Sequence, residues 1–336
     1  MTHTWGHHHD AGWRTSCTPS LFSSVGLLFE NMSTYHVWFH CLFLAHLAIS
    51  SAFFVLPRQT RHVAEIRTGL ASSDLVQTSD SSLLKESVSS QNWDALKSPT
   101  THLVFPGGGI FFYWQAGVVT YLREQGYQID ATTLTGASAG ALVATLTCTD
   151  VDFYKATELA LRMAKQAGVW GRKQGLQGIW GPMIEDWLDS LLPEDAAERA
   201  SNRLSLLVTP VPRFGKKKVQ HFWSKQDLIR CNMASVHLPW FLDGKLTTNF
   251  REHVCIDGSF LAKPQDYLPS TEDSGNGKSS ALILDYNNDP AYQQKRLLDF
   301  VDAVSPQGIW QMLEDGKRYA RLLEENGQLE ILKNSS

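Results

Sequence analysis

Two strand–turn–helix patterns follow one another in the middle of the chain and constrain its fold more than any other feature. The first runs from THLVFP (residues 101–106) through three glycines into a helical repeat, expected over about Tyr113–Glu124 and ending near Gly126. The second runs from TTLTG through the stretch GASAG (136–140) into the helical pattern ALVATL. Strands that alternate with helices in this way predict an α/β fold with a parallel sheet.

The glycines of the first turn are Gly107, Gly108 and Gly109. Glycine permits positive φ angles, and the start of a helix leaves backbone N–H groups without intrahelical partners. Such groups suit an anion, which is either a phosphate or a developing oxyanion. The spacing is not G-x-G-x-x-G and no G-K-[ST] follows within this loop, so neither nucleotide-binding pattern is matched.

The second turn places Ser138 between Gly136 and Gly140. The form G-x-S-x-G is that of a nucleophile elbow, in which a sharp strand-to-helix turn exposes the serine hydroxyl. An ordinary turn can have the same sequence. The preceding strand–glycine–helix unit favours the nucleophile, because it supplies a candidate oxyanion site next to it.

A serine that reacts near neutral pH needs a neighbouring group to take its proton. Three histidines follow Ser138 in the sequence: His221, His237 and His253. All of them precede Asp257 in CIDGSF, whereas α/β-hydrolases have the order serine, acid, histidine. A triad that ends at His253 and uses Asp227 or Asp243 remains an alternative, although it has no local signature.

The strand–GGG–helix unit, GASAG and the later D-G-S together resemble the patatin-like phospholipases, over about Leu103 to at least Pro264. The resemblance implies a three-layer α/β fold with a central, mostly parallel sheet flanked by helices. It also implies a Ser–Asp dyad that uses no histidine, metal or organic cofactor. The matching positions are Ser138 as nucleophile, Asp257 as general base, Gly107, Gly108, Gly109 and Ala139 as the oxyanion hole, and Gly136, Gly140 and Gly258 as motif glycines.

One departure from the family pattern concerns substrate choice. After the three glycines the family usually has a small or apolar residue, a basic residue and a fourth glycine, whereas this chain has Ile110, Phe111 and Phe112. The spacing to Gly117 is kept. We expect Phe111 and Phe112 to line the substrate site, with Phe112 reshaping the glycine loop as the alternative.

The resemblance implies hydrolysis of fatty acyl esters, as in a phospholipase A, a galactolipase or a lipase, at a membrane or lipid-droplet surface. Alternatives are an acyltransferase that uses the same dyad and an inactive lipid-binding protein. The net charge of −4 gives no argument for a nucleic-acid partner. Five widely spaced cysteines without a C-x-x-C pair argue against a disulfide framework or a zinc site.

Residues 1–56 are an N-terminal extension that contains the hydrophobic segment 37–56. Its length suits a membrane anchor. If the chain starts at Met32, it reads instead as a secretory signal with Ser50 and Ala52 before a cleavage point. The junction SSAFFVLP resembles the signal-plus-transit junction of algae with secondary plastids, so we expect routing through the secretory pathway to such a plastid. Residues 57–98 read as a transit-like, Ser-rich linker, and residues 99–336 as the catalytic domain.

Three further segments have expected structures. PRFGKKKVQHF (212–222) reads as a hairpin with Lys216–Lys218 at its tip, either as a solvated turn or against anionic lipid headgroups. The amphipathic pattern at Pro182–Leu192 predicts a helix that either caps the pocket or only packs. ALILDY (281–286) reads as a core strand, and the helical patterns after Leu297 as packing.

Overall fold

The computed structural model describes residues 63–65, 101–268, 280–292 and 303–333, all within the compact unit Pro57–Ser336. The expectations for residues 1–56, including the signal or anchor segment 37–56 and the start at Met32, lie outside the described residues. Within the described ranges, no helix combines the length and hydrophobicity that a bilayer crossing needs.

A mixed sheet forms the centre of the described part, with the strand order β1-β8-β2-β3-β4-β7-β6 and with β5 paired to β4 beside this path. The strands are β1 (Val63–Glu65), β2 (Thr101–Phe105), β3 (Thr133–Gly136), β4 (Leu204–Pro210), β5 (Lys217–Val219), β6 (Thr248–Phe250), β7 (His253–Ile256) and β8 (Ser280–Ile283). The four neighbours β8, β2, β3 and β4 are parallel, and antiparallel strands extend the sheet at both sides. The expected strands at 101–106, at TTLTG and in ALILDY are confirmed. β1 lies in the segment 57–98 that composition assigned to a linker.

The central strands are buried on both faces. In β2 all five residues are buried. Leu103 and Phe105 join the large hydrophobic core on one face, while Val104 belongs to a smaller cluster on the other. A continuous apolar run of this kind is typical of a parallel strand covered on both sides.

The helices are α2 (Phe112–Glu124), α3 (Ala139–Cys148), α4 (Phe153–Gln166), α5 (Trp180–Leu191), α6 (Ala196–Ala200), α7 (Lys225–Ser235), α8 (Pro264–Tyr267) and α9 (Pro306–Glu325). Short 3₁₀ turns span Gly109–Phe111, Ile129–Ala131, Val169–Gly171, Tyr286–Asn288, Pro290–Tyr292 and Glu330–Leu332. The expected helices at Tyr113–Glu124, ALVATL and Pro182–Leu192 are confirmed, the last two with shifted ends.

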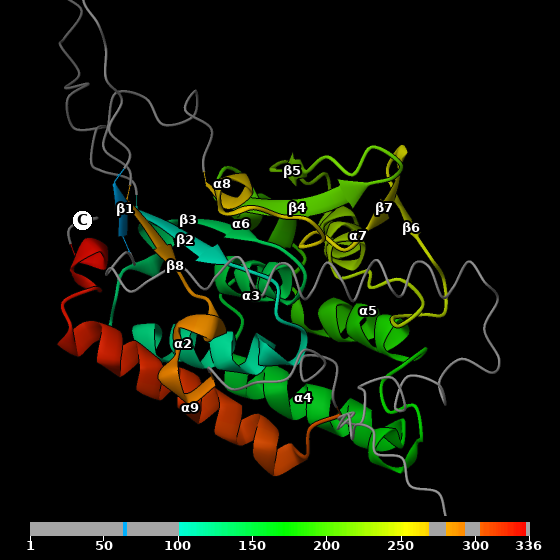
Figure 1. Ribbon diagram of the computed structural model, residues 1–336, viewed down its shortest axis with the longest axis horizontal. Coiled ribbons are helices and arrows are strands. Elements are labelled where there is room, and N and C mark those ends of the chain that lie inside the picture. Colours follow the sequence, from blue (N-terminus) through cyan, green and yellow to red (C-terminus); the bar gives the residue numbers. More distant parts are fainter. Residues whose placement is uncertain (1–62, 66–100, 269–279, 293–302, 334–336) are drawn as a thin grey trace, which may run out of the picture. The chain divides into compact units, whose positions relative to one another are not determined.

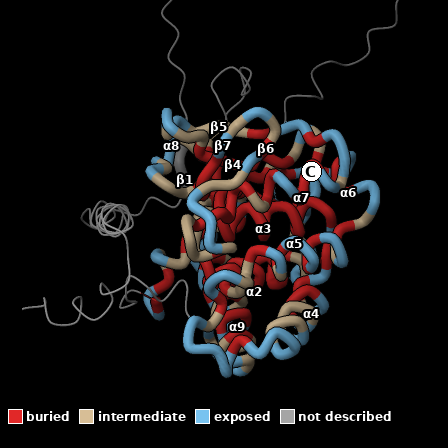
Figure 2. The backbone as a smooth tube through the Cα atoms, turned by 90° about the vertical axis from the view of Figure 1, so that its right-hand side faces the viewer, coloured by how far each residue is buried: buried red, intermediate tan, exposed pale blue. Residues whose placement is uncertain are grey.

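The connections between the parallel strands determine which face of the sheet each helix covers. The units β2–α2–β3 and β3–α3–β4 step in the same direction along the sheet, so right-handed crossovers place both helices on one face. Figure 1 shows α3 next to the strands, with α2, α9, α4 and α5 further away. On the other face Tyr267 of α8 packs with Val104, Ala137 and Leu207. The buried residues run through the strands and α3 (Figure 2). A sheet flanked by helices is therefore the observed architecture.

Helices α2 and α9 touch at two glycines. A Cβ atom on Gly117 would lie 1.9 Å from the carbonyl oxygen of Leu313, and one on Gly316 would lie 1.9 Å from that of Trp114. Only glycine permits backbones to approach so closely. The expectation that the C-terminal region packs as helix is thus confirmed for α9.

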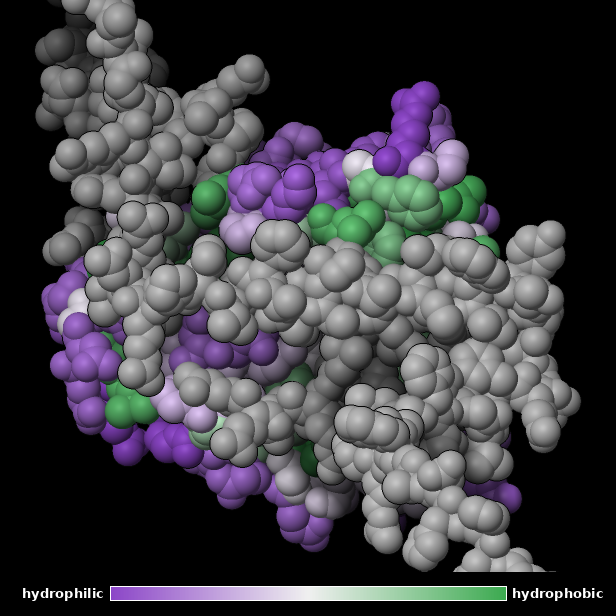
Figure 3. Space-filling view, in the orientation of Figure 1, coloured by the Kyte–Doolittle hydropathy of each residue, from purple (hydrophilic) through white to green (hydrophobic). Residues whose placement is uncertain are grey.

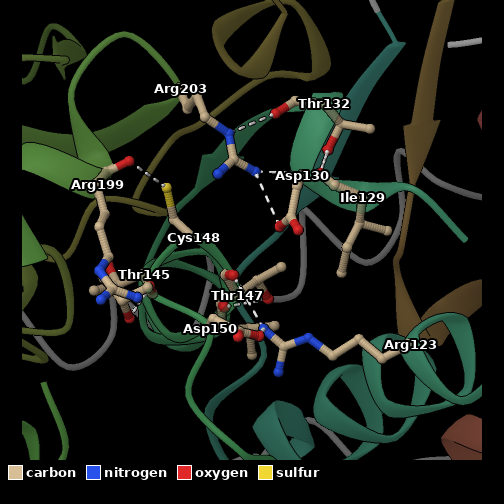
Figure 4. A network of polar contacts seen from close by, with 12 residues as sticks. Arg123, Ile129, Asp130, Thr132, Thr145, Thr147, Cys148, Asp150, Arg199 and Arg203 are labelled. Atoms are coloured by element: carbon tan, nitrogen blue, oxygen red, sulfur yellow. Dashed lines mark hydrogen bonds and ion pairs between the residues drawn. The ribbon is translucent and has the colours of Figure 1, made fainter. Parts of the chain in front are cut away.

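Arginines hold the loops at the end of the sheet where β3 and β4 begin (Figure 4). Arg123 donates to the carbonyl oxygens of Val151 (2.6 Å) and Thr147 (3.1 Å), at and just after the C-terminus of α3, where the last carbonyls lack their usual intrahelical partners. Arg203 donates to the carbonyl oxygens of Thr132 and Ile129 just before β3. This end is occupied by structural contacts, and the turns with the candidate site residues lie at the opposite ends of the strands.

Candidate active site

Ser138 occupies the sharp turn between β3 and α3. Its backbone has φ 53° and ψ −129°, a conformation that L-residues rarely adopt. A Cβ on Gly140 would lie 1.9 Å from the carbonyl oxygen of Phe105, and one on Gly136 would lie 2.2 Å from that of Gly140. The two motif glycines therefore permit β2, the turn and α3 to meet, while Ser138 carries the strained backbone between them.

Ser235 at the end of α7 connects this turn to the loop that carries Asp257. Its hydroxyl accepts a hydrogen bond from Ser138 N (3.0 Å) and donates to Leu207 O (2.7 Å). Its carbonyl accepts from Gly258 N (2.8 Å). No motif or spacing in the sequence predicts this role for Ser235. Nothing in a run of small residues marks one serine as the link between two distant loops.

Asp257 follows β7 and is almost fully buried. Its amide donates to the carbonyl of His237 (2.9 Å). Its Oδ1 accepts from the amide (2.8 Å) and the hydroxyl (2.6 Å) of Ser259. Its Oδ2 is buried and has no hydrogen bond within 3.5 Å in the described part of the chain. One carboxylate oxygen is therefore fixed and the other is available.

Burial raises the pKa of the Asp257 carboxyl above its ordinary value. Of the groups that act in the opposite direction, the Ser138 hydroxyl has the largest effect, followed by the hydroxyl and amide of Ser259 and the charge of Lys216. The structure thus brings the loops of Ser138 and Asp257 together from distant parts of the sequence, and their roles as nucleophile and base stay a prediction. Neither Ser259 nor Lys216 was identified as part of this site from the sequence.

The glycine loop lies beside both side chains. A Cβ on Gly107 would lie 2.7 Å from the Cβ of Ser259 and 3.2 Å from that of Ser138. Gly109 has φ 54° and begins a 3₁₀ turn. The amides of Gly108, Gly109 and Ala139 find no acceptor among the described residues, as expected at helix N-termini.

A cavity of about 90 Å³ begins at these groups. Gly109, Ser138 and Ala139 line it together with mostly apolar side chains. These come from α2, α4, α5 and the region of α9, and include Phe112, Met163, Trp180, Trp187, Val304 and Ile309. α5 forms one wall, which agrees with the interpretation of that helix as lying near the pocket. The region after Leu297 also contributes to the cavity, so its assignment to packing alone is corrected.

Phe111 and Phe112 point to different places. Phe112 lines the cavity and meets the ring of Trp187 edge to face, with centroids 5.6 Å apart. Phe111 stacks on Tyr286 at 4.0 Å and contacts Tyr292 edge to face, away from the residues that line the cavity. The expectation that both rings line the substrate site is corrected for Phe111.

The lysine-rich hairpin also differs from its expected form. The strands β4 and β5 pair as a hairpin, but Lys217 and Lys218 lie inside β5 and Lys216 just before it. All three are half-buried. Lys216 Nζ donates to Thr209 Oγ1 (2.7 Å) and Lys218 Nζ to Leu268 O (2.5 Å). The expectation of three lysines at a solvated tip is therefore wrong, because the register places Lys217 and Lys218 in the strand and Lys216 directly before it.

None of the three downstream histidines is hydrogen-bonded to Ser138 within the described ranges. His221 is exposed, and His253 Nε2 lies 2.6 Å from Lys217 Nζ. His237 is buried, and its carbonyl accepts from Asp257 N.

Comparison with known proteins agrees with this geometry. Residues 103–268 match the family described as patatin-like phospholipase. The human "Patatin-like phospholipase domain-containing protein 2" is 33% identical over 187 residues, which are 52% of this chain and 34% of the relative. The mouse "Omega-hydroxyceramide transacylase" is 29% identical over 172 residues, 48% of this chain and 28% of the relative. The chain thus spans about a third of the length of these curated relatives.

Among solved structures, VipD from Legionella pneumophila is matched with a TM-score of 0.31 and 14% identity, over 55% of this chain and 49% of that one. The glycine loop, the serine turn and the aspartate loop all fall within residues 103–268. Residues 103–268 therefore form a patatin-like phospholipase region.

Proposed function

We propose that this protein is a lipid acyl hydrolase that cleaves fatty acyl esters through a dyad of Ser138 and Asp257. The observation that carries the proposal is the buried Asp257 carboxylate. Its Oδ2 has no hydrogen-bond partner in the described residues, and the Ser138 hydroxyl stabilises the charge of the carboxylate at the mouth of an apolar cavity. The match to the family supports lipid hydrolysis in general, and the dyad is the proposal for this chain.

In the first half of the reaction, Asp257 takes the hydroxyl proton while Ser138 Oγ attacks the ester carbonyl carbon. The amides of Gly108, Gly109 and Ala139 are the candidate donors to the oxyanion. The protonated Asp257 then gives its proton to the departing alcohol oxygen, and the acyl group stays on Ser138.

In the second half, Asp257 takes a proton from water as the water oxygen attacks the acyl-serine. Collapse of this intermediate releases a fatty acid, and Asp257 returns the proton to Ser138 Oγ. The apolar walls of the cavity suit an acyl chain, because its transfer from water is favourable by about 0.8 kcal/mol per CH₂.

The test is a panel of phospholipids, galactolipids and acylglycerols incubated with the full chain, with products identified by mass spectrometry. We expect free fatty acids, and we expect a fluorophosphonate to attach to Ser138 and to stop their release. Release that continues after full labelling, or a folded protein that releases no acid and takes no label, would contradict the proposal. The second result would favour an inactive lipid-binding protein.

Acyl transfer is a second candidate, because one relative is named a transacylase. An alcohol would then replace water in the second half of the reaction. The same panel with a long-chain alcohol added distinguishes the two. New ester at the expense of fatty acid favours transfer, and unchanged fatty acid release favours hydrolysis.

Phe112 is expected to limit the acyl chains that fit the cavity. Phe112→Ala should raise turnover of longer chains relative to shorter ones, because the ring lines the cavity next to Trp187. The measurement is the ratio of kcat/KM for a long and a short acyl ester. Phe111→Ala is the matched control: it removes the same ring from a buried site outside the cavity and should leave this ratio unchanged. A change of similar size in both variants would contradict the assignment.

A further inference from the structure

The turn that carries Asp257 is closed by its own backbone. Phe260 N donates to Asp257 O (3.2 Å), so residues 257–260 form a tight turn. The same carbonyl also accepts from the hydroxyl of Thr209 (2.8 Å). Thr209 lies in β4 with Ile256 as its register partner, and it is fully buried. The backbone of Asp257 is therefore tied to the end of β4 through one side chain.

Lys216 contacts both ends of this turn. Its Nζ donates to Thr209 Oγ1 (2.7 Å), which in turn donates to Asp257 O. The same Nζ donates to the carbonyl oxygen of Phe260. The Lys216 side chain thus completes a ring of hydrogen bonds that includes the Thr209 hydroxyl and the backbone of Asp257 and Phe260.

The ammonium group of Lys216 has no ion-pair partner within 4.0 Å in the described part of the chain. Burial lowers the pKa of Lys216 to about 8, and the charges of Asp257 and Asp266 act in the opposite direction. Tyr267 of α8 is a further titratable group near Asp257, and burial raises its pKa. Because a half-buried ammonium loses hydration, its position here requires a compensating interaction.

We propose that Lys216 is a positioning residue for Asp257, which holds the turn 257–260 through Thr209 and the Phe260 carbonyl and keeps a positive charge behind the carboxylate. The inference rests on the proposed function, in which Asp257 must be ionised to accept a proton. A positive charge nearby favours the ionised form, so its loss raises the pKa of Asp257 further.

The test compares Lys216→Met and Lys216→Gln, which remove the charge, with Lys216→Arg, which keeps it. Activity needs the deprotonated aspartate, so kcat/KM rises with pH through the pKa of Asp257, which lies above the ordinary value of 3.8. We expect this rise to move to higher pH by roughly 1 unit in the Met and Gln variants. We expect it to stay near its wild-type position in the Arg variant.

Lys217→Met is the matched control, because Lys217 is the next lysine along and contacts His253 instead. A titration of the ¹³C-labelled Asp257 carboxyl by NMR, assigned by its loss in Asp257→Asn, gives a second reading that needs no turnover. Thermal melting confirms that each variant is folded.

A carboxyl titration that is unchanged in folded Lys216→Met and Lys216→Gln overturns the inference. An equal shift in Lys217→Met also overturns it, since the effect would then not depend on this position. If the wild-type protein hydrolyses no lipid, the proposed function fails, while the carboxyl titration still decides the role of Lys216.

Discussion

Asp257→Asn is expected to lower kcat/KM by about 10²–10⁴-fold, because an amide cannot take the Ser138 proton. The asparagine side chain keeps the shape of the aspartate and can still accept from Ser259 at its Oδ1 position. Ser138→Ala should cause a loss at least as large, and the double variant should be little worse than Ser138→Ala, because the two groups act in the same step. The measurement is kcat/KM for the best substrate of the lipid panel, with thermal melting to confirm folding.

The matched control for this prediction is His253→Gln, which removes the histidine of the alternative triad. A dyad predicts near-wild-type turnover in this variant, because His253 contacts Lys217 rather than Ser138 in the described residues. A histidine-dependent enzyme predicts the reverse pattern, with a large loss in His253→Gln and substantial turnover in Asp257→Asn. That reverse pattern would exclude the dyad.

The parts of the site that could be predicted from sequence are those with a local pattern. The two strand–glycine–helix units are short and continuous, so backbone rules predict Ser138 and the glycine loop in their turns. Asp257 was found through a motif and its order in the chain. By contrast, Ser235 and Lys216 act through contacts with residues that are distant in the sequence. The hydroxyl of Ser235, for example, accepts a hydrogen bond from the amide of Ser138. No periodicity or spacing reports such contacts.

The corrected expectations have equally physical reasons. Phe111 and Phe112 are adjacent at the end of a 3₁₀ turn, where successive side chains point about 120° apart. One ring therefore enters the cavity and the other packs against Tyr286. The sequence predicts a solvated turn for Lys216–Lys218, because charged side chains usually face solvent. Pairing of β5 with β4 instead directs Lys216 to backbone and hydroxyl acceptors.

Gly140→Ala is expected to lower the free energy of unfolding by about 3 kcal/mol, at the upper end of the usual cost of overpacking. The new methyl group would lie 1.9 Å from the carbonyl oxygen of Phe105 and 2.6 Å from that of Pro106. Both are backbone atoms at the end of β2, so relief requires that α3 move away from the sheet. The measurement is equilibrium unfolding in urea, followed by circular dichroism.

Gly171→Ala is the matched control, because a Cβ there meets no atom of the described residues within 4 Å and the residue has no positive φ. Its effect should stay within about 0.5 kcal/mol, as for most exposed substitutions. If Gly140→Ala is as stable as the control, the close contact between β2 and the serine turn is wrong. If it is destabilised but still folded, movement of α3 should displace Ser138 from Asp257, since Ser138 directly precedes that helix as its N-cap residue. Labelling of Ser138 by a fluorophosphonate should then slow in Gly140→Ala and stay unchanged in Gly171→Ala, because the contact that stabilises the turn also sets the distance over which the proton moves.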